Sequence, residues 1–192
     1  MNIPVFLSCS GPYTKEQEAF KAKVRTHLED YLGFMPRTLG ETDYDPEEPL
    51  TACRRLMMEC NGLITLAFRR YYVHEGWEYP DSPPQTKLQD KKTDNPIKQN
   101  PIAGKYFTSP WCQIEATMAF SLGLPILVFR EKGVIERGLL AKGIAGLYLP
   151  EEFDVNNPED YLQRQEWKEI ISEWGGWVRA VRRSKGYPPR AY

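Results

Sequence analysis

Two almost continuous apolar runs constrain the fold of this chain more than any other feature. They are Leu63–Phe68 and Pro125–Phe129, and each has the length of a strand. A strand that is apolar at nearly every position is covered on both faces, as strands are in a parallel sheet. Segments with strand-like and helix-like patterns alternate around the two runs. The sequence therefore predicts an α/β fold, with helices on both faces of a parallel sheet.

The remaining elements complete this alternation. We expect strands at 4–8, 34–38, 63–68 and 125–129, and a short last strand at 147–149. We expect helices between Thr14 and Gly33 and at 50–60, 109–122, 134–142 and 158–184. With a flavodoxin-like strand order, the turn at Ser8–Gly11 and the loop before the helix of 109–122 flank the crevice where such folds bind ligands.

The organisation that we predict is an α/β domain at 1–150 with a C-terminal helical extension at 151–192. A long insertion at 69–108 interrupts the domain before the helix of 109–122. We expect the prolines of this insertion to prevent regular elements and its aromatic residues to make it a mobile lid. The acidic, proline-bounded segment at 41–48 is predicted to be a solvated loop.

Composition excludes several classes of function. The formal net charge is −1, from 25 basic and 26 acidic residues, so no overall field recruits nucleic acid or a membrane surface. No apolar run spans a bilayer and no signal peptide is recognisable, which predicts a cytoplasmic protein. The 4 cysteines lack metal-ligand spacing, so we expect reduced thiols and no metal site. The 2 histidines leave little material for a catalytic triad.

The helix of 109–122 places one carboxylate among apolar positions. At about 100° per residue, Glu115 falls between Ala119 and Leu122. A buried, unpaired charge costs several kcal/mol. Glu115 therefore either reaches solvent at a ragged edge of the stripe, or pairs, or faces a cleft where it acts chemically.

The order of these segments resembles the TIR domain family. Val5–Gly11 resembles the family's first strand and following loop, and the acidic segment 41–49 stands where the family has its BB loop. Trp111-x-x-x-Glu115, followed by Gly123-x-Pro125-Ile126, matches the family's glutamate helix and next strand. The insertion at 69–108 departs from the family, which usually has a short loop there.

The resemblance implies one of two behaviours: cleavage of NAD by a single glutamate, or protein–protein assembly without catalysis. For the enzyme it implies Glu115 as the catalytic residue, NAD or a related nucleotide as the substrate, and no cofactor. It also implies a role in antiviral defence signalling. The partners that it implies are a second copy of the chain, another TIR-containing protein or an effector.

The candidates for substrate contacts come from several segments. They are Ser8, Cys9, Ser10, Gly11, Trp111, Arg69, Tyr71 and Asp43. Arg69 or Arg70 is suited to hold a phosphate, and the adjacent tyrosines are suited to stack on a base. Each candidate also has a structural interpretation, because Ser and Gly form turns, strand-end arginines face solvent and helix tryptophans pack in cores.

A second resemblance is to nucleoside 2-deoxyribosyltransferase-like N-glycosidases, which also use a glutamate on a helix. That family commonly carries an aspartate shortly before its glutamate, whereas Ser109–Pro110 precedes the helix here. One carboxylate is enough for NAD, because nicotinamide leaves from a cationic form without a proton and the carboxylate stabilises the oxocarbenium-like transition state. A neutral pyrimidine nucleotide needs more help, for which Asp43 or Asp45 is a candidate if their loop folds over the site.

Overall fold

A four-stranded parallel sheet forms the centre of the protein, in the strand order β2-β1-β3-β8. The computed structural model describes residues 3–80, 100–141, 143–144 and 152–184. The strands of the sheet are β1 (Ile3–Cys9), β2 (Phe34–Arg37), β3 (Leu63–Ala67) and β8 (Ile126–Arg130). This order confirms the expected flavodoxin-like α/β fold. The short strand expected at 147–149 lies outside the described residues.

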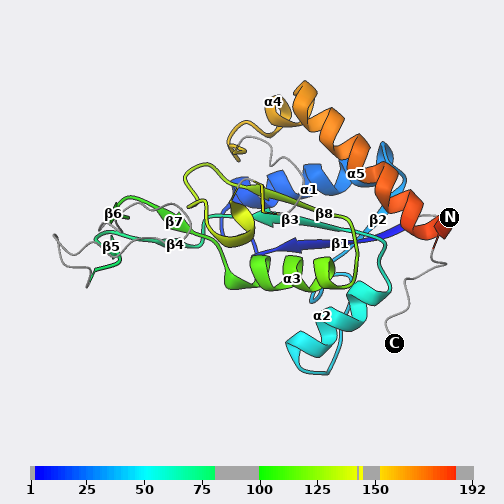
Figure 1. Cartoon of the computed structure of the whole chain (residues 1–192). Coiled ribbons are helices and arrows are strands. Elements are labelled where there is room, and N and C mark those ends of the chain that lie inside the picture. Colours follow the sequence, from blue (N-terminus) through cyan, green and yellow to red (C-terminus); the bar gives the residue numbers. More distant parts are fainter. Residues whose placement is uncertain (1–2, 81–99, 142, 145–151, 185–192) are drawn as a thin grey trace.

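Helices cover both faces of the sheet, as expected (Figure 1). One face is covered by α1 (Lys15–Asp30), α4 (Pro158–Gln163) and α5 (Gln165–Ser184), and the other by α2 (Pro49–Met58) and α3 (Pro110–Ser121). Among the described residues, no helix combines the length and the apolar character needed to cross a membrane.

Local sequence explains where the two helices nearest the ends of β1 and β3 begin. Thr14 caps α1, because its hydroxyl accepts a hydrogen bond from the Gln17 N–H at 3.2 Å. Ser109 caps α3 in the same way through the Trp111 N–H, and Pro110 occupies the first turn, where no donor is needed. The Ser-Pro pair therefore fixes the start of the helix that carries Glu115.

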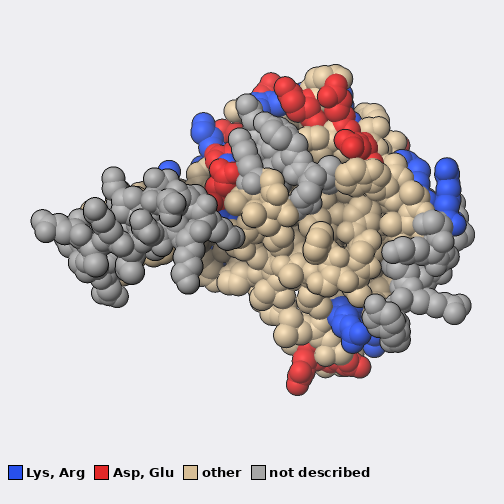
Figure 2. Space-filling view, viewed as in Figure 1, with Lys and Arg blue, Asp and Glu red and all other residues tan. Residues whose placement is uncertain are grey.

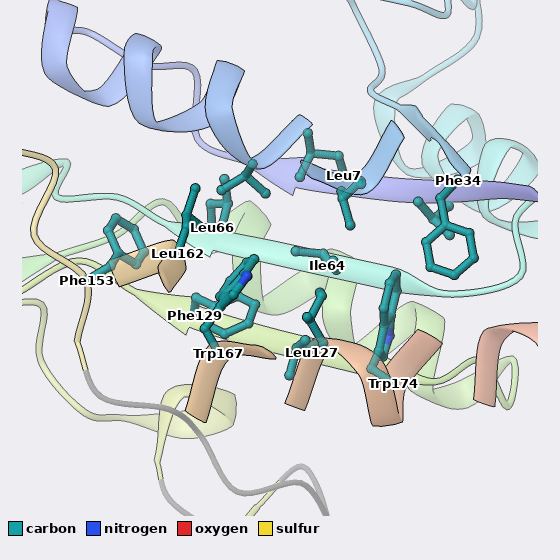
Figure 3. Close-up of a cluster of buried hydrophobic side chains, with 14 of the residues drawn as sticks. Leu7, Phe34, Ile64, Leu66, Leu127, Phe129, Phe153, Leu162, Trp167 and Trp174 are labelled. Atoms are coloured by element: carbon teal, nitrogen blue, oxygen red, sulfur yellow. The ribbon is translucent and has the colours of Figure 1, made fainter. Parts of the chain in front are cut away.

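Large aromatic and aliphatic side chains fill the face under α1 and α5. Figure 3 shows Trp167 and Trp174 of α5 packed against Ile64, Leu127 and Phe129 of the sheet. Trp174 is fully buried, lies edge-to-face with Phe34 and donates its indole N–H to the Pro125 carbonyl at 3.0 Å. The C-terminal helix thus contributes directly to the largest buried cluster.

Two helical expectations are wrong in detail. The helix expected at 158–184 is interrupted at Arg164, which has extended backbone angles, and continues without a break through Gly175 and Gly176. Gly175 stays helical and buried, and an added Cβ there would lie 3.5 Å from the Phe34 ring. The helix expected at 134–142 is only a single 3₁₀ turn, Gly138–Leu140.

The insertion contains short antiparallel ribbons, so the expectation that prolines exclude regular elements is wrong. The paired strands are β4 (Tyr71–Tyr72) with β7 (Tyr106–Phe107), and β5 (Trp77–Glu78) with β6 (Asn100–Pro101). Figure 1 shows these ribbons as an arm that projects beyond the end of the sheet to which β1 and β3 point. Residues 81–99 of the insertion lie outside the described residues, and its action as a lid stays a prediction.

Removal of one aromatic side chain of α5 tests the contribution of this helix. We expect Trp174→Ala to lower the free energy of unfolding by about 3–5 kcal/mol, because it leaves a large cavity in the buried cluster. The matched control is Trp177→Ala, because the Trp177 side chain is 42% exposed on the same helix. This variant should lower the free energy of unfolding by less than about 0.5 kcal/mol. Urea denaturation measures both, and equal losses would contradict the packing described here.

Candidate active site

Glu115 lies on the flank of α3, at the boundary between buried and exposed positions. The buried side of α3 is formed by Cys112, Ala116 and Ala119, and Glu115 is three or four residues from two of them. The side chain is consequently half-buried. The sequence-based expectation that this carboxylate would lie beside the apolar stripe agrees with the geometry.

Two neutral groups hold the carboxylate of Glu115. The Ser8 hydroxyl of β1 donates a hydrogen bond to Oε2, and the Cys53 thiol of α2 lies 3.5 Å from Oε1. No lysine, arginine or histidine in the described parts of the chain forms an ion pair with Glu115. Burial raises the pKa of Glu115, while the hydrogen bonds from Ser8 and Cys53 partly oppose that rise.

Alternation along β1 decides which candidates face Glu115. Phe6 packs in the cluster under α2 and α3, whereas Leu7 and Cys9 contact the cluster under α1. Successive side chains point to opposite faces of a strand. Ser8 therefore faces α3, and Cys9 faces away from it.

Two buried hydroxyl groups, one on β3 and one just after β1, have no hydrogen-bond partner among the described residues. Thr65, which pairs with Ser8 in the register of β3 and β1, is fully buried, and Ser10 is 6% exposed. Neither hydroxyl forms a hydrogen bond with a described residue. An unpaired buried hydroxyl costs about 1–3 kcal/mol, so both groups are suited to bind water or a polar ligand.

Cys9 belongs to a separate charged cluster on the α1 side. Burial raises the pKa of its thiol, and the nearby Lys21 ammonium opposes that rise. Lys21 is itself buried and forms an ion pair with Glu41, which also contacts Arg25. This cluster ties the start of the acidic segment to α1.

Gly11 follows β1 and contacts an arginine of the insertion. Arg70 donates a hydrogen bond to the Gly11 carbonyl at 3.1 Å, and its guanidinium lies 5.9 Å from the Tyr13 ring centroid. Arg70 is otherwise exposed. The described structure thus places Arg70, of the two neighbouring arginines, against the loop after β1.

Arg69 and Tyr71 have other surroundings. Arg69 donates to the Lys132 carbonyl at 2.6 Å, lies 3.6 Å from Glu131 and stacks 4.6 Å from the Tyr106 ring centroid. Tyr71 is 56% exposed on the β4–β7 ribbon. The contacts of these two residues do not join them to Glu115 or to the loop after β1.

Asp43 is held at the end of β2. Its carboxylate accepts hydrogen bonds from Arg37 at 3.1 and 3.2 Å and from the Thr42 hydroxyl at 2.7 Å. Burial alone would raise the pKa of Asp43, but these hydrogen bonds outweigh it and the pKa is lowered. The neighbouring Asp45 forms an ion pair with Arg55. Both aspartates are thus held by arginines.

Trp111 and Cys112 occupy the first turn of α3. Trp111 is 37% exposed, one helical turn before Glu115. Cys112 is buried with its sulfur 3.5 Å from the Thr108 hydroxyl, and burial raises its pKa to about 11. This thiol stays protonated at neutral pH and is a poor nucleophile. Apart from Glu115, α3 carries no charged residue, and Figure 2 shows an uncharged area across the middle of the face on which α3 lies.

Glu131, which directly follows β8, is a buried glutamate whose environment differs from that of Glu115. Glu131 is 4% exposed and accepts hydrogen bonds from the Gln17 amide at 2.9 Å and the Arg69 N–H at 2.8 Å. The Arg69 guanidinium lies nearby as a countercharge. These contacts link α1 to the ends of β3 and β8, which is a structural role.

Comparisons with known proteins give distant likenesses only. No family model and no curated protein matches this sequence. Similar solved structures include the Clostridium botulinum CMP N-glycosidase BcmB (16% identity, 85% of this chain and 98% of that chain, TM-score 0.44). They also include the TIR domains of the activated Roq1 resistosome (12% identity, 96% of this chain and 86% of that chain, TM-score 0.39). A third is the 2-desoxiribosyltransferase from Leishmania mexicana (13% identity, 83% of this chain and 96% of that chain, TM-score 0.39). Likenesses this distant do not indicate an activity.

Cys53 contacts Glu115 but was not among the site residues expected from the sequence. In the sequence, Cys53 looks like an ordinary buried position of α2, beside Ala52, Leu56 and Met57. No local signal distinguishes a thiol that packs from one that also reaches a carboxylate on another helix. The contact depends on the packing of α2 beside α3, which only the structure shows.

Glu131 and the half-buried Glu115 should respond differently to loss of charge. Glu131→Gln should lower the free energy of unfolding by about 1–3 kcal/mol, because it places an amide N–H₂ near Arg69. Glu115→Gln should leave stability unchanged or higher at neutral pH, since it removes a charge without a countercharge. Thermal denaturation of the two variants at one pH tests the contrast. A larger loss for Glu115→Gln than for Glu131→Gln would exclude it.

The stability gain of Glu115→Gln should depend on pH in a defined direction. The folded protein holds the Glu115 proton above the ordinary pKa of 4.5, so the wild type loses stability as pH rises from about 4.5 to the raised pKa. The glutamine variant lacks this loss. The difference in melting temperature between variant and wild type should therefore grow from about pH 4 to pH 7, and a constant difference would contradict a raised pKa.

Proposed function

We propose that this protein is an N-glycosidic bond enzyme that cleaves the nicotinamide–ribose bond of NAD, as a glycohydrolase or cyclase, with Glu115 as its catalytic carboxylate. One observation supports this most. Glu115 is half-buried beside the carboxyl end of β1, is held by two neutral donors, and has no cationic partner among the described residues. Its charge is therefore available to a cation that develops on a substrate.

The reaction breaks the bond between C1 of the ribose and the pyridinium nitrogen. The electron pair of that bond leaves with nicotinamide, whose nitrogen becomes neutral, and C1 becomes part of an oxocarbenium ion. Ionised Glu115 stabilises this cation. In the glycohydrolase, water then forms the new C–O bond at C1 and releases a proton; in the cyclase, a nucleophilic atom of the same molecule forms the bond instead.

The surroundings of Glu115 supply no obvious proton donor, which favours a cationic leaving group. Asp43 has a lowered pKa and is ionised at neutral pH. Asp45 is paired with Arg55. The Cys53 pKa is raised to about 12, which makes the thiol a very weak acid. A neutral pyrimidine leaving group requires protonation that these groups are poorly suited to give, whereas nicotinamide requires none.

The TIR resemblance extends the proposal to the biological setting. A role in antiviral defence signalling and assembly with a second copy or another TIR-containing protein are part of it. A non-catalytic adaptor gains nothing from a half-buried carboxylate without a countercharge, because burial of that charge costs free energy. For this reason the enzyme is our first proposal.

Incubation of the purified protein with NAD, CMP and a panel of nucleosides and nucleotides tests the substrate, with released base separated by chromatography. We expect nicotinamide from NAD and no base from the others. Glu115→Gln should lower the rate by at least about a hundredfold, because the amide cannot oppose the oxocarbenium charge. Glu131→Gln, assayed at a temperature at which it is folded, is the control and should retain activity. Release of cytosine from CMP alone, or wild-type activity of Glu115→Gln, would overturn the proposal.

The pH profile gives an independent measurement. Because Glu115 acts in its ionised form and its pKa is raised, kcat should fall at acidic pH with a midpoint above the ordinary glutamate value of 4.5. Steady-state rates across this range, at saturating NAD, locate the midpoint. A midpoint at or below 4.5 would mean that a different group controls the reaction.

A further inference from the structure

The carboxylate of Glu115 is held from two different elements. Ser8 belongs to β1, the strand between β2 and β3, and donates to Oε2. Cys53 belongs to α2, and its sulfur lies 3.5 Å from Oε1, within the range of a thiol–oxygen hydrogen bond. Since the two donors address different oxygens, together they restrict rotation of the carboxylate about its final torsion, which is otherwise soft.

We infer that Cys53 is a positioning residue for Glu115: its thiol and the Ser8 hydroxyl fix the direction of the carboxylate without neutralising its charge. This inference rests on the proposed function. A lysine or arginine in the place of Cys53 would also fix the carboxylate, but it would compete with a cationic substrate for the same charge. A neutral donor avoids that competition.

The position of Cys53 is itself well fixed. The residue is 1% exposed and packs in the cluster that also contains Met57 of α2 and Ala116 of α3. An S–H group is a weak donor, so its main effect is on orientation.

The contact between Cys53 and Glu115 keeps one protonation state of the thiol at neutral pH. The thiols on which the charge of Glu115 acts are Cys53 of α2, Cys112 of α3 and, from the opposite face of the sheet, Cys9 of β1. Burial raises the pKa of each thiol, so at neutral pH all three are neutral. At neutral pH Cys53 therefore remains a hydrogen-bond donor to Glu115.

Two substitutions at Cys53 and one control separate positioning from packing. Cys53→Ala removes the donor, and Cys53→Ser replaces it with a hydroxyl. Cys60→Ala removes an equally buried thiol at the end of α2, from the same cluster, that does not contact Glu115. The loss of packing should be similar in the two alanine variants, and only Cys53→Ala should affect the carboxylate.

The first measurement is the pKa of the Glu115 carboxyl, followed by NMR of protein with ¹³C-labelled glutamate and assigned by loss of the signal in Glu115→Gln. Loss of a hydrogen bond to the charged form raises a carboxyl pKa. We therefore expect the pKa to be higher in Cys53→Ala than in the wild type, unchanged in Cys60→Ala, and restored or lowered in Cys53→Ser. This measurement needs no enzymatic activity.

The second measurement is the steady-state rate with NAD across pH. Cys53→Ala should lower kcat by about tenfold with a smaller change in KM, and should move the acidic midpoint upward with the NMR pKa. Cys53→Ser should recover most of kcat, and Cys60→Ala should match the wild type. Cys53→Ala that changes the pKa and kcat no more than Cys60→Ala does would overturn the inference.

The two proposals fail in distinguishable ways. If the wild type releases no base from any substrate, the proposed function fails, and the NMR pKa alone decides whether Cys53 holds Glu115. If base is released and depends on Glu115 but not on Cys53, the function stands and the positioning role is wrong. A Cys53→Ala variant that does not fold is replaced by Cys53→Val, which also removes the donor and fills more of the space.

Discussion

The alternation of side chains along β1 is the constraint on which the site depends. Phe6 and Ser8 face α2 and α3, whereas Leu7 and Cys9 face α1. Parallel pairing on both sides fixes this strand, since Phe6 is opposite Arg37 of β2 and Leu63 of β3. A shift of one residue would turn every apolar side chain to the wrong face and remove the Ser8 hydroxyl from Glu115. The core that stabilises the sheet therefore also determines which hydroxyl reaches the carboxylate.

Glu115 and Glu131 show how the same type of side chain can be held in different environments. Glu131 is surrounded by donors that include an arginine, and its contacts join α1 to the ends of two strands. Within the described residues, Glu115 is held by a hydroxyl and a thiol, and its pKa is raised by burial. A buried carboxylate without a countercharge is kept at a cost in stability. That cost has a reason if the carboxylate meets a cation that arrives with a substrate.

Sequence periodicity was sufficient for the parallel sheet and its covering helices, and for the position of Glu115 close to the apolar side of α3, whereas the strand order was an assumption taken from other folds of this kind. The sheet, the helices and the position of Glu115 depend on repeats of two or 3.6 residues, which are local. The sequence could not decide that Arg70 and not Arg69 meets the loop after β1, because adjacent residues on an irregular segment differ only in direction. The contact between Cys53 and Glu115 was equally hidden, since it joins two helices distant in the chain. The break at Arg164, where the backbone is extended, has no signal in helix propensity, since arginine is a good helix former.

α5 and α3 pack against opposite faces of the sheet with side chains of different size. Large aromatic residues fill the face under α1 and α5, including Phe20, Phe129, Trp167 and Trp174. α3 instead buries the small side chains Cys112, Ala116 and Ala119, which pack beside larger residues of the sheet such as Phe6 and Leu63. Small residues at a helix contact let the helix axis approach the sheet closely, and a larger side chain there would push α3 outward. Because the Ser8 hydrogen bond requires that close approach, the small residues of α3 are as necessary to the site as the donors themselves.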